Sequence, residues 1–251
     1  MVKAAAILAL FLTLAMSAAA SAHSRPRAEP ACRARVFEGT SFTVCAYDPA
    51  RQRLSLVAGG PDSLPALQMS LGPAARRVDF ALNAGMYQPD RSPVGLFVAG
   101  GRAVAPLNRA DGAGNFFLKP NGVFWTDAAG APHLDETEAF AARAPAAAWA
   151  TQSGPLMVRG GALHPAIAEN GTSLTVRDAV GVAGRRALFV VSDAPVSFGR
   201  LARFMRDALG CPDALYLDGH VASLWAPALR RQDGRTGLGT FVVVLARDRR
   251  R

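Results

Sequence analysis

Short apolar runs, interrupted by glycine, proline and polar residues, recur along this chain and predict a fold rich in β-structure. The runs occupy residues 53–57, 78–82, 95–98, 103–105, 115–118, 123–125, 156–158, 187–191, 215–217 and 237–246. Asn121-Gly122 lies between two of them, and this pair favours the tight turn of a hairpin, so we expect residues 115–118 and 123–125 to pair. The pattern predicts many short strands, most of them antiparallel.

One stretch has a clear helical period. Apolar residues at 198, 201, 204, 205, 208 and 209 share one face, Ser197 is a suitable cap and Gly210 a suitable stop. This helix joins a strand that ends at Asp193 to a strand that ends at Asp218. A strand–helix–strand unit is commonly a parallel crossover, so both strand ends should lie at one edge, where Asp193 and Asp218 would line one cleft.

Other helical signals are few. Ser63 can cap a short helix near residues 63–71, and the alanine-rich residues 139–148 are ambiguous. The predicted fold class is therefore α+β: a single domain of twisted, mainly antiparallel or mixed sheet, with few helices and one strand–helix–strand crossover.

The first 22 residues are typical of a secretory signal peptide. Lys3 precedes an apolar run over residues 4–16, and Ala20-Ser21-Ala22 is a small-x-small cleavage signal. The run is too short to span a bilayer, and no later run approaches its length. We therefore expect one domain over residues 23–251, exported to the periplasm or the cell exterior without a transmembrane segment.

Two of the three cysteines flank one predicted hairpin. Cys32 and Cys45 enclose residues 36–44, which read as two strands around a glycine-containing turn. In an oxidising compartment these side chains could meet across the hairpin, so we predict a Cys32–Cys45 disulfide. Cys211 is left over and is more typical of a buried small hydrophobic residue than of a nucleophile.

The formal charge of +9 comes almost wholly from arginine, because Lys3 and Lys119 are the only lysines. The arginines are scattered and are not interleaved with aromatic residues, so we expect no nucleic-acid partner. Two interpretations stay open: affinity for anionic envelope polymers or phosphorylated glycans, and a solvated basic surface with no special partner.

The stretch from Asp213 to Ser223 is the most informative one for chemistry. Leu215, Tyr216 and Leu217 predict a buried strand that stops at Asp218-Gly219. A carboxylate at the end of a buried strand is held by rigid backbone and can be aimed at a ligand. The alternative is that Asp218 only caps its own turn, as Asp before Gly commonly does.

Five motifs occur in order along the chain: Asn-Ala-Gly-Met-Tyr at 83–87, Pro-Asn-Gly-Val-Phe at 120–124, Gln-Ser-Gly-Pro at 152–155, Arg-Asp-Ala-Val-Gly at 177–181 and Leu-Asp-Gly at 217–219. With this series the chain resembles the phosphodiester glycosidase family, in particular its compact bacterial exported branch. His220 stands where that family often has a small residue, and it would narrow the pocket or supply a proton.

The resemblance implies hydrolysis of the bond between a sugar's anomeric carbon and a phosphate oxygen. A phosphate leaving group needs its negative charge held, and the planar arginine fork does this well. Arg177 is the first candidate for this role and Arg91 the second. The sugar end needs a carboxylate as nucleophile or as base for water; Asp218 is the leading candidate and Asp193 the second.

Further residues of the motifs are candidate substrate-binding groups. They are Asn83, Gly85, Asn121, Gln152, Ser153, Gly154, Gly219, His220 and Ser223. For each polar one, a turn-forming role is the alternative. Asp218 and Asp193, with nearby carbonyls, could bind a divalent cation such as calcium, whereas the four histidines are too widely spread to predict zinc.

Two other classes of function stay open. One is a non-catalytic envelope protein that keeps the cleft and binds a glycan or an anionic polymer; the other is a purely structural envelope protein. The joint presence of the Asp, Arg and Asn positions favours the enzyme, with a phosphorylated glycan or sugar phosphate as substrate.

Overall fold

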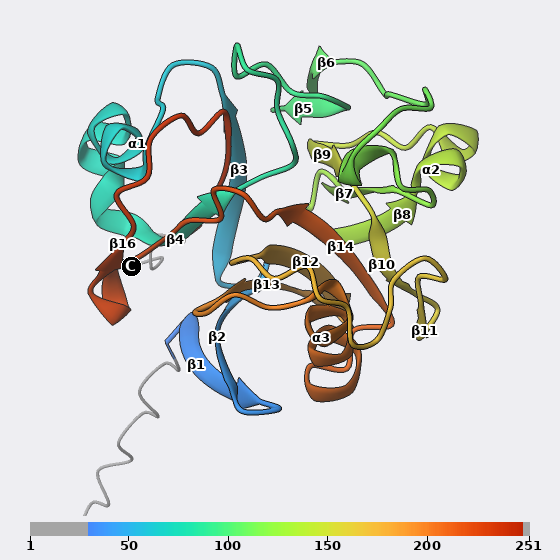
Figure 1. Ribbon diagram of the computed structural model, residues 1–251. Coiled ribbons are helices and arrows are strands. Elements are labelled where there is room, and N and C mark those ends of the chain that lie inside the picture. Colours follow the sequence, from blue (N-terminus) through green and yellow to red (C-terminus); the bar gives the residue numbers. More distant parts are fainter. Residues whose placement is uncertain (1–29, 248–251) are drawn as a thin grey trace, which may run out of the picture.

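Residues 30–247, which this computed structural model describes, form three antiparallel sheets (Figure 1). The seven-stranded sheet has the order β1 (Cys32–Phe37), β2 (Thr40–Tyr47), β13 (Arg186–Ser192), β12 (Asp178–Ala183), β14 (Asp213–Asp218), β10 (Leu156–Arg159) and β11 (Ala162–Leu163). One five-stranded sheet has the order β16 (Arg231–Gln232), β15 (Leu224–Ala226), β4 (Val78–Asn83), β17 (Thr240–Ala246) and β3 (Gln52–Ala58). The other has the order β6 (Arg102–Ala105), β5 (Phe97–Ala99), β9 (Trp149–Ser153), β7 (Gly122–Thr126) and β8 (Pro132–Glu136).

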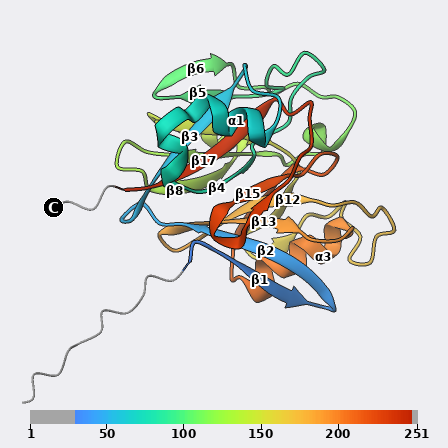
Figure 2. The same cartoon turned by 90° about the vertical axis from the view of Figure 1, so that its left-hand side faces the viewer.

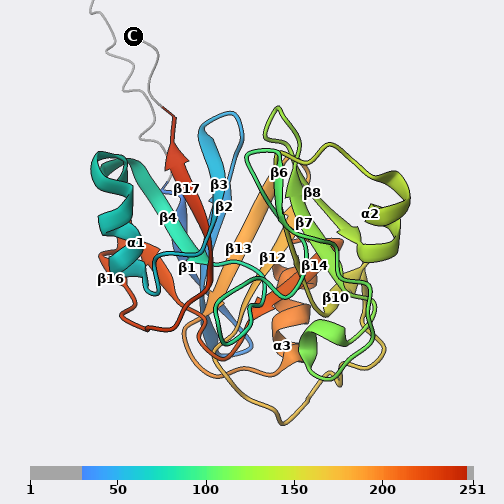
Figure 3. The same ribbon diagram turned by 90° about the horizontal axis from the view of Figure 1, so that it is seen from above.

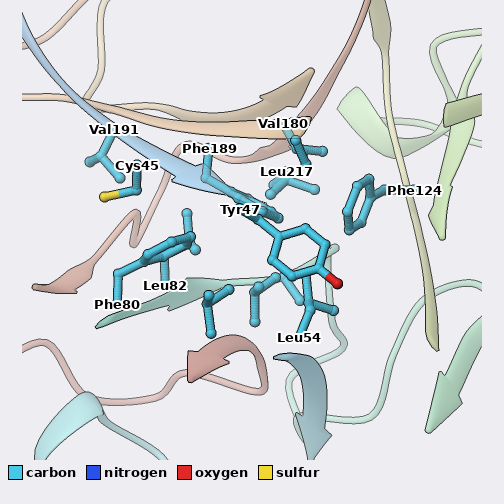
Figure 4. Close-up of a cluster of buried hydrophobic side chains, with 14 of the residues drawn as sticks. Cys45, Tyr47, Leu54, Phe80, Leu82, Phe124, Val180, Phe189, Val191 and Leu217 are labelled. Carbon is cyan, nitrogen blue, oxygen red and sulfur yellow. The ribbon is translucent and has the colours of Figure 1, made fainter. Parts of the chain in front are cut away.

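The three sheets share one apolar core. Phe189 of the seven-stranded sheet packs edge-on against Phe124 and tilted against Phe80, which come from the two other sheets. Figure 4 shows these rings with Tyr47, Leu82 and Leu217 pointing toward one another. Because side chains alternate along a strand, every second residue of the central strands enters this core and the others face outward.

Helices cover the outward faces of the sheets (Figures 1 and 3). Helix α1 (Leu64–Leu71) lies over β4 and β17, and α2 (Thr137–Arg143) packs beside β7 and β8. Helix α3 (Phe198–Arg203), which continues as a π-helical turn over Phe204–Ala208, covers the outward face of the seven-stranded sheet. Three 3₁₀ turns, Gly72–Arg77, Asn115–Phe117 and Pro227–Leu229, complete the helical elements among residues 30–247.

The predicted fold class is confirmed, and with it both capped helices. Ser63 and Ser197 accept backbone N–H groups of Ala66 and Arg200 at the starts of α1 and α3. The predicted crossover is also present: β13 and β14 each run antiparallel to β12, and therefore parallel to one another. The view from the side in Figure 2 shows α3 along the seven-stranded sheet, close to β2.

The Cys32–Cys45 disulfide forms across the β1–β2 hairpin, where the two residues are register partners, and Cys211 is buried. The predicted signal peptide lies outside the described residues. Within residues 30–247, no helix combines the length and the apolar character needed to cross a membrane.

One predicted hairpin is wrong. Residues 115–118 do not form a strand: Asn115–Phe117 is a 3₁₀ turn, and Gly122 begins β7, which pairs with β8 and β9. The Asn121 side chain is buried and donates to the carbonyl of Phe116 at 2.9 Å, while the Phe116 ring fills the interior. The apolar character of this run therefore reflects burial of a loop, which a short run cannot distinguish from a strand.

Candidate active site

Two aspartates meet at the edge where β12 begins and β14 ends. Asp178 and Asp218 are register partners beside a β-bulge, and Asp178 Oδ1 accepts the backbone N–H of Asp218 at 2.5 Å. Asp178 is fully buried, whereas Asp218 keeps 8% of its surface exposed. Of this pair, Asp218 is therefore the carboxylate that a ligand can reach.

The Asp218 carboxylate is surrounded by hydrogen-bond donors. Its Oδ1 accepts the backbone N–H of Gly219 at 2.5 Å and that of His220 at 2.9 Å, and its Oδ2 accepts Nδ2 of Asn83 at 3.3 Å. Asp218 thus caps its own turn and also lies at the end of a rigid strand, so both predicted roles are compatible.

The surroundings of Asp178 disfavour its charged form. Burial, and then the negative charge of Asp218, raise the pKa of Asp178 well above its usual value. Its Oδ2 has no hydrogen-bond partner among residues 30–247. Protonation of Asp178 would relieve the repulsion between the two carboxyl groups.

Asn83 and Ser223 join this pair from the β4–β15 side. Asn83 ends β4, is fully buried, and accepts the backbone N–H of Ser223 at its Oδ1, 2.9 Å away. Gly85 follows on the same segment and is held between Thr151 and Thr240 by its N–H and its carbonyl. A Cβ at Gly85 would lie 2.2 Å from the carbonyl oxygen of Gln152, so only glycine fits there.

The other amide and hydroxyl residues of the motifs support the site from behind. Gln152 Oε1 accepts the N–H groups of Leu96 and Asn108, and Ser153 Oγ donates to the carbonyl of Leu217 at 3.0 Å. A Cβ at Gly154 would lie 2.5 Å from the carbonyl oxygen of Phe116. The same oxygen accepts a hydrogen bond from Nδ2 of Asn121. Gln152, Ser153 and Asn121 thus hold loops and strand β14, and substrate contact by them stays a prediction.

Arg177 lies beneath the Asp218 turn with its donors occupied. The guanidinium stacks 3.8 Å from the ring centroid of Phe198 and donates to Val196, Tyr216 and Ser173. Burial lowers the pKa of the Arg177 guanidinium, and none of the ion pairs among residues 30–247 includes it. This arrangement suits a structural role for Arg177. Because the guanidinium is buried and its donors are occupied, the structure gives no support to the predicted binding of phosphate by Arg177.

Gly219 completes that support. A Cβ on Gly219 would lie 1.7 Å from the Tyr216 hydroxyl and 3.3 Å from Cγ of Arg177. The turn can therefore rest directly on Tyr216 and Arg177 only because residue 219 has no side chain.

Asp193 and Arg91 lie outside the hydrogen-bonded cluster. The carboxylate of Asp193 accepts the hydroxyls of Ser41 and Thr43 and pairs with Arg231 at 2.6 Å. Arg91 has a positive φ of 69° and donates to the carbonyl of Gly60. The crossover thus brings the strand ends to one edge, but the hydrogen bonds and the ion pair of Asp193 do not join it to Asp218.

The family model for the phosphodiester glycosidases matches residues 76–239, a segment that contains Asn83, Asp178 and Asp218. The chain belongs to this family. The uncharacterized protein YigE of Escherichia coli (strain K12) is 34% identical over 152 residues, which are 59% of this chain and 58% of YigE. The match therefore spans less than two thirds of that relative.

Two solved structures share the fold of this phosphodiester glycosidase domain. One is the catalytic domain of zebrafish N-acetylglucosamine-1-phosphodiester alpha-N-acetylglucosaminidase, auto-inhibited by its pro-peptide, with a TM-score of 0.60 and 13% identity over 86% of this chain and 82% of that one. The other is a Burkholderia pseudomallei protein proposed to be exported, with a TM-score of 0.56 and 14% identity over 82% of this chain and 74% of that one.

Three residues of this family member belong at the site although the sequence did not single them out. Asp178 lies inside the motif at 177–181, where the sequence alone assigns it no role. Tyr87 ends another motif; burial, and then the charges of Asp218 and Asp178, raise its pKa, so its hydroxyl stays a donor near the pair. Arg235 is exposed at the rim of the site, by which we mean the surface beside the Asp218 turn, and its Nη1 donates to the His220 carbonyl at 3.3 Å.

The predicted cation site gains no further ligands. Among residues 30–247, no group of three or more His, Cys, Asp or Glu side chains comes together in a way that could hold a metal ion. Calcium binding by Asp218 and Asp193 therefore stays a prediction from the sequence.

Proposed function

We propose that this protein hydrolyses the bond between the anomeric carbon of a sugar and a phosphate oxygen. The observation that carries the proposal is Asp218, a largely buried carboxylate with 8% of its surface exposed, which accepts hydrogen bonds from backbone N–H groups in a member of the phosphodiester glycosidase family. Asp218 acts at the anomeric carbon, as nucleophile or as base for water.

The charge of the aspartate pair suits this leaving group. An ordinary glycosidase needs a carboxylic acid to protonate a poor leaving group, but a phosphate leaves as an anion and needs little protonation. One ionised carboxylate therefore suffices, and Asp178 can stay buried and neutral while it holds the N–H of Asp218. Its role in the proposal is to position the reacting residue.

The rim provides groups for the phosphate and the sugar. Arg235 has donors left over from its single bond to His220, and a planar guanidinium can bind two phosphate oxygens. In this proposal the Tyr87 hydroxyl, which lies close enough to feel the charges of Asp218 and Asp178, and the exposed His220 ring contact sugar hydroxyls. We propose a phosphorylated glycan or sugar phosphodiester as substrate, met outside the cytoplasm after export.

Hydrolysis in ¹⁸O-labelled water tests this reaction. With a methylumbelliferyl or alkyl diester of a sugar 1-phosphate, we expect the label in the released sugar, because the C1–O bond breaks. Label in the phosphate would instead show attack on phosphorus and contradict the proposal. A shift in melting temperature with sugar phosphates, without any turnover across a panel of sugars, would favour the non-catalytic binding protein.

The neutral state of Asp178 makes stability depend on pH. Its pKa is raised in the folded protein, so its contribution is complete below the unfolded value near 3.8 and is lost as pH rises through the folded value. Urea unfolding between about pH 4 and 8 should show Asp178→Asn gaining stability relative to the wild type as pH rises.

Asp90→Asn is the control for that experiment. The Ser92 hydrogen bond lowers the pKa of Asp90, so its titration lies at lower pH and its replacement should not change the slope in this range. Parallel curves for the wild type and Asp178→Asn would show that Asp178 is ionised in the native protein.

A further inference from the structure

A concave surface lies at the opposite ends of the strands that carry the site. It is a groove of about 800 Å³. Strand β4 starts there with Val78 and Asp79 and ends at Asn83, while β12 starts at Asp178 and ends there with Ala183. At about 3.3 Å per residue, the six residues of β4 separate the groove from the site by roughly 17 Å.

Arginine dominates the charged lining of this groove. The lining includes Arg33, Arg35, Arg51, Arg186 and Arg247, against Asp48 and Asp79. Both carboxylates already accept hydrogen bonds, Asp79 from Gln52 and Asp48 from the N–H of Ala50. The groove therefore has an excess of positive charge that its own acidic residues do not neutralise.

Three of these arginines have side chains free for a ligand. Arg35, Arg51 and Arg186 are exposed, and none of the ion pairs or side-chain hydrogen bonds among residues 30–247 includes them. They come from β1, the β2–β3 turn and β13, three segments far apart in the sequence. The fold thus gathers them on one surface.

The neighbouring sequence adds charge of the same sign. Arg25 and Arg27 precede Pro30 and outnumber Glu29, and Arg249, Arg250 and Arg251 follow Arg247 and outnumber Asp248. In sequence, the segments next to Pro30 and Arg247 therefore carry more positive than negative charge.

We propose that this groove binds a linear polymer that carries repeated phosphate groups. A concave surface suits a chain better than it suits a flat membrane, and several guanidinium forks suit a row of phosphate oxygens. A single sugar phosphate cannot reach both the groove and Asp218 across the length of β4, but a polymer can. The choice of a phosphate polymer over a carboxylate polymer rests on the proposed function. The excess of positive charge in the groove is observed independently of that function.

The test compares two triple variants of the full protein that lose the same charge. Arg35→Gln/Arg51→Gln/Arg186→Gln alters the groove, and Arg76→Gln/Arg102→Gln/Arg159→Gln removes three exposed arginines elsewhere. Calorimetry with long-chain inorganic polyphosphate should show binding weakened at least about tenfold by the first variant and little changed by the second. Turnover of a small sugar phosphodiester should be unaffected by either, so this result is independent of whether the active site works.

Four outcomes would overturn the proposal. Equal weakening by both variants would show attraction to the general surface charge. Equal affinity for polygalacturonate would show that phosphate is not selected, and equal affinity for inorganic phosphate would show that no polymer is needed. Groove-dependent binding to phosphatidylglycerol vesicles, without binding of polyphosphate, would make the partner a membrane.

Discussion

Replacing Asp218 by Asn is expected to lower turnover of a sugar 1-phosphodiester by about a thousandfold or more. The substitution keeps an oxygen that can accept the N–H groups of Gly219 and His220, so the turn should persist. What disappears is the charge that acts at the anomeric carbon in the proposed reaction. Sugar phosphate should bind as well as before or more tightly, because a negative charge leaves the site of an anionic ligand.

The measurement pairs steady-state turnover with calorimetric binding of the same sugar phosphate. Asp193→Asn is the matched control, because Asp193 lies at the same sheet edge as Asp218. Its carboxylate contacts Ser41, Thr43 and Arg231 rather than Asp218. Unfolding in urea should show a loss of about 1 kcal/mol or less for Asp218→Asn, from the long bond to Asn83. Near wild-type turnover in this variant, with a large loss in Asp193→Asn, would transfer the catalytic role to Asp193.

The second large effect is expected at Arg177, on stability. Arg177→Lys should lower the free energy of unfolding by roughly 2 to 4 kcal/mol, because one ammonium group cannot reach Val196, Tyr216 and Ser173 together. Turnover by the protein that stays folded should fall much less than it does in Asp218→Asn.

Arg235→Gln serves as the contrasting variant. Its guanidinium is exposed at the rim, so stability should stay within about 0.5 kcal/mol of the wild type while KM rises. If Arg177→Lys were as stable as the wild type and inactive, Arg177 would be the phosphate clamp that the sequence predicted.

The sequence was sufficient to place strand β14 and its terminal Asp218, because an apolar run that stops at Asp-Gly has few other solutions. It was not sufficient to find the partner of Asp218. Register pairs Asp178 with Asp218 but Ala179 with Tyr216, so a bulge skips one residue. A one-residue bulge leaves no trace in the alternation of apolar and polar positions, and the two aspartates are forty positions apart.

The sequence also could not predict the direction in which the polar side chains of the motifs point. Gln152, Asn121 and Ser153 have the residue types of ligand-binding groups, yet their amides and hydroxyl bond to Asn108, Phe116 and Leu217. A motif preserves the identity of such residues whether they face the ligand or the loop behind it. Only the packing of the three sheets decides between these roles.

That packing has a consequence for how ligand binding is felt by the rest of the protein. Asn83 belongs to one sheet, Asp218 to a second, and Ser153, which holds the strand of Asp218, to the third. A sugar phosphate bound at Asp218 would therefore stabilise the packing of all three sheets. These sheets already contact one another where Phe189 packs against Phe80 and Phe124. Occupancy of the site would slow the opening of all three sheets together, so that a bound sugar phosphate would protect the whole protein against proteolysis.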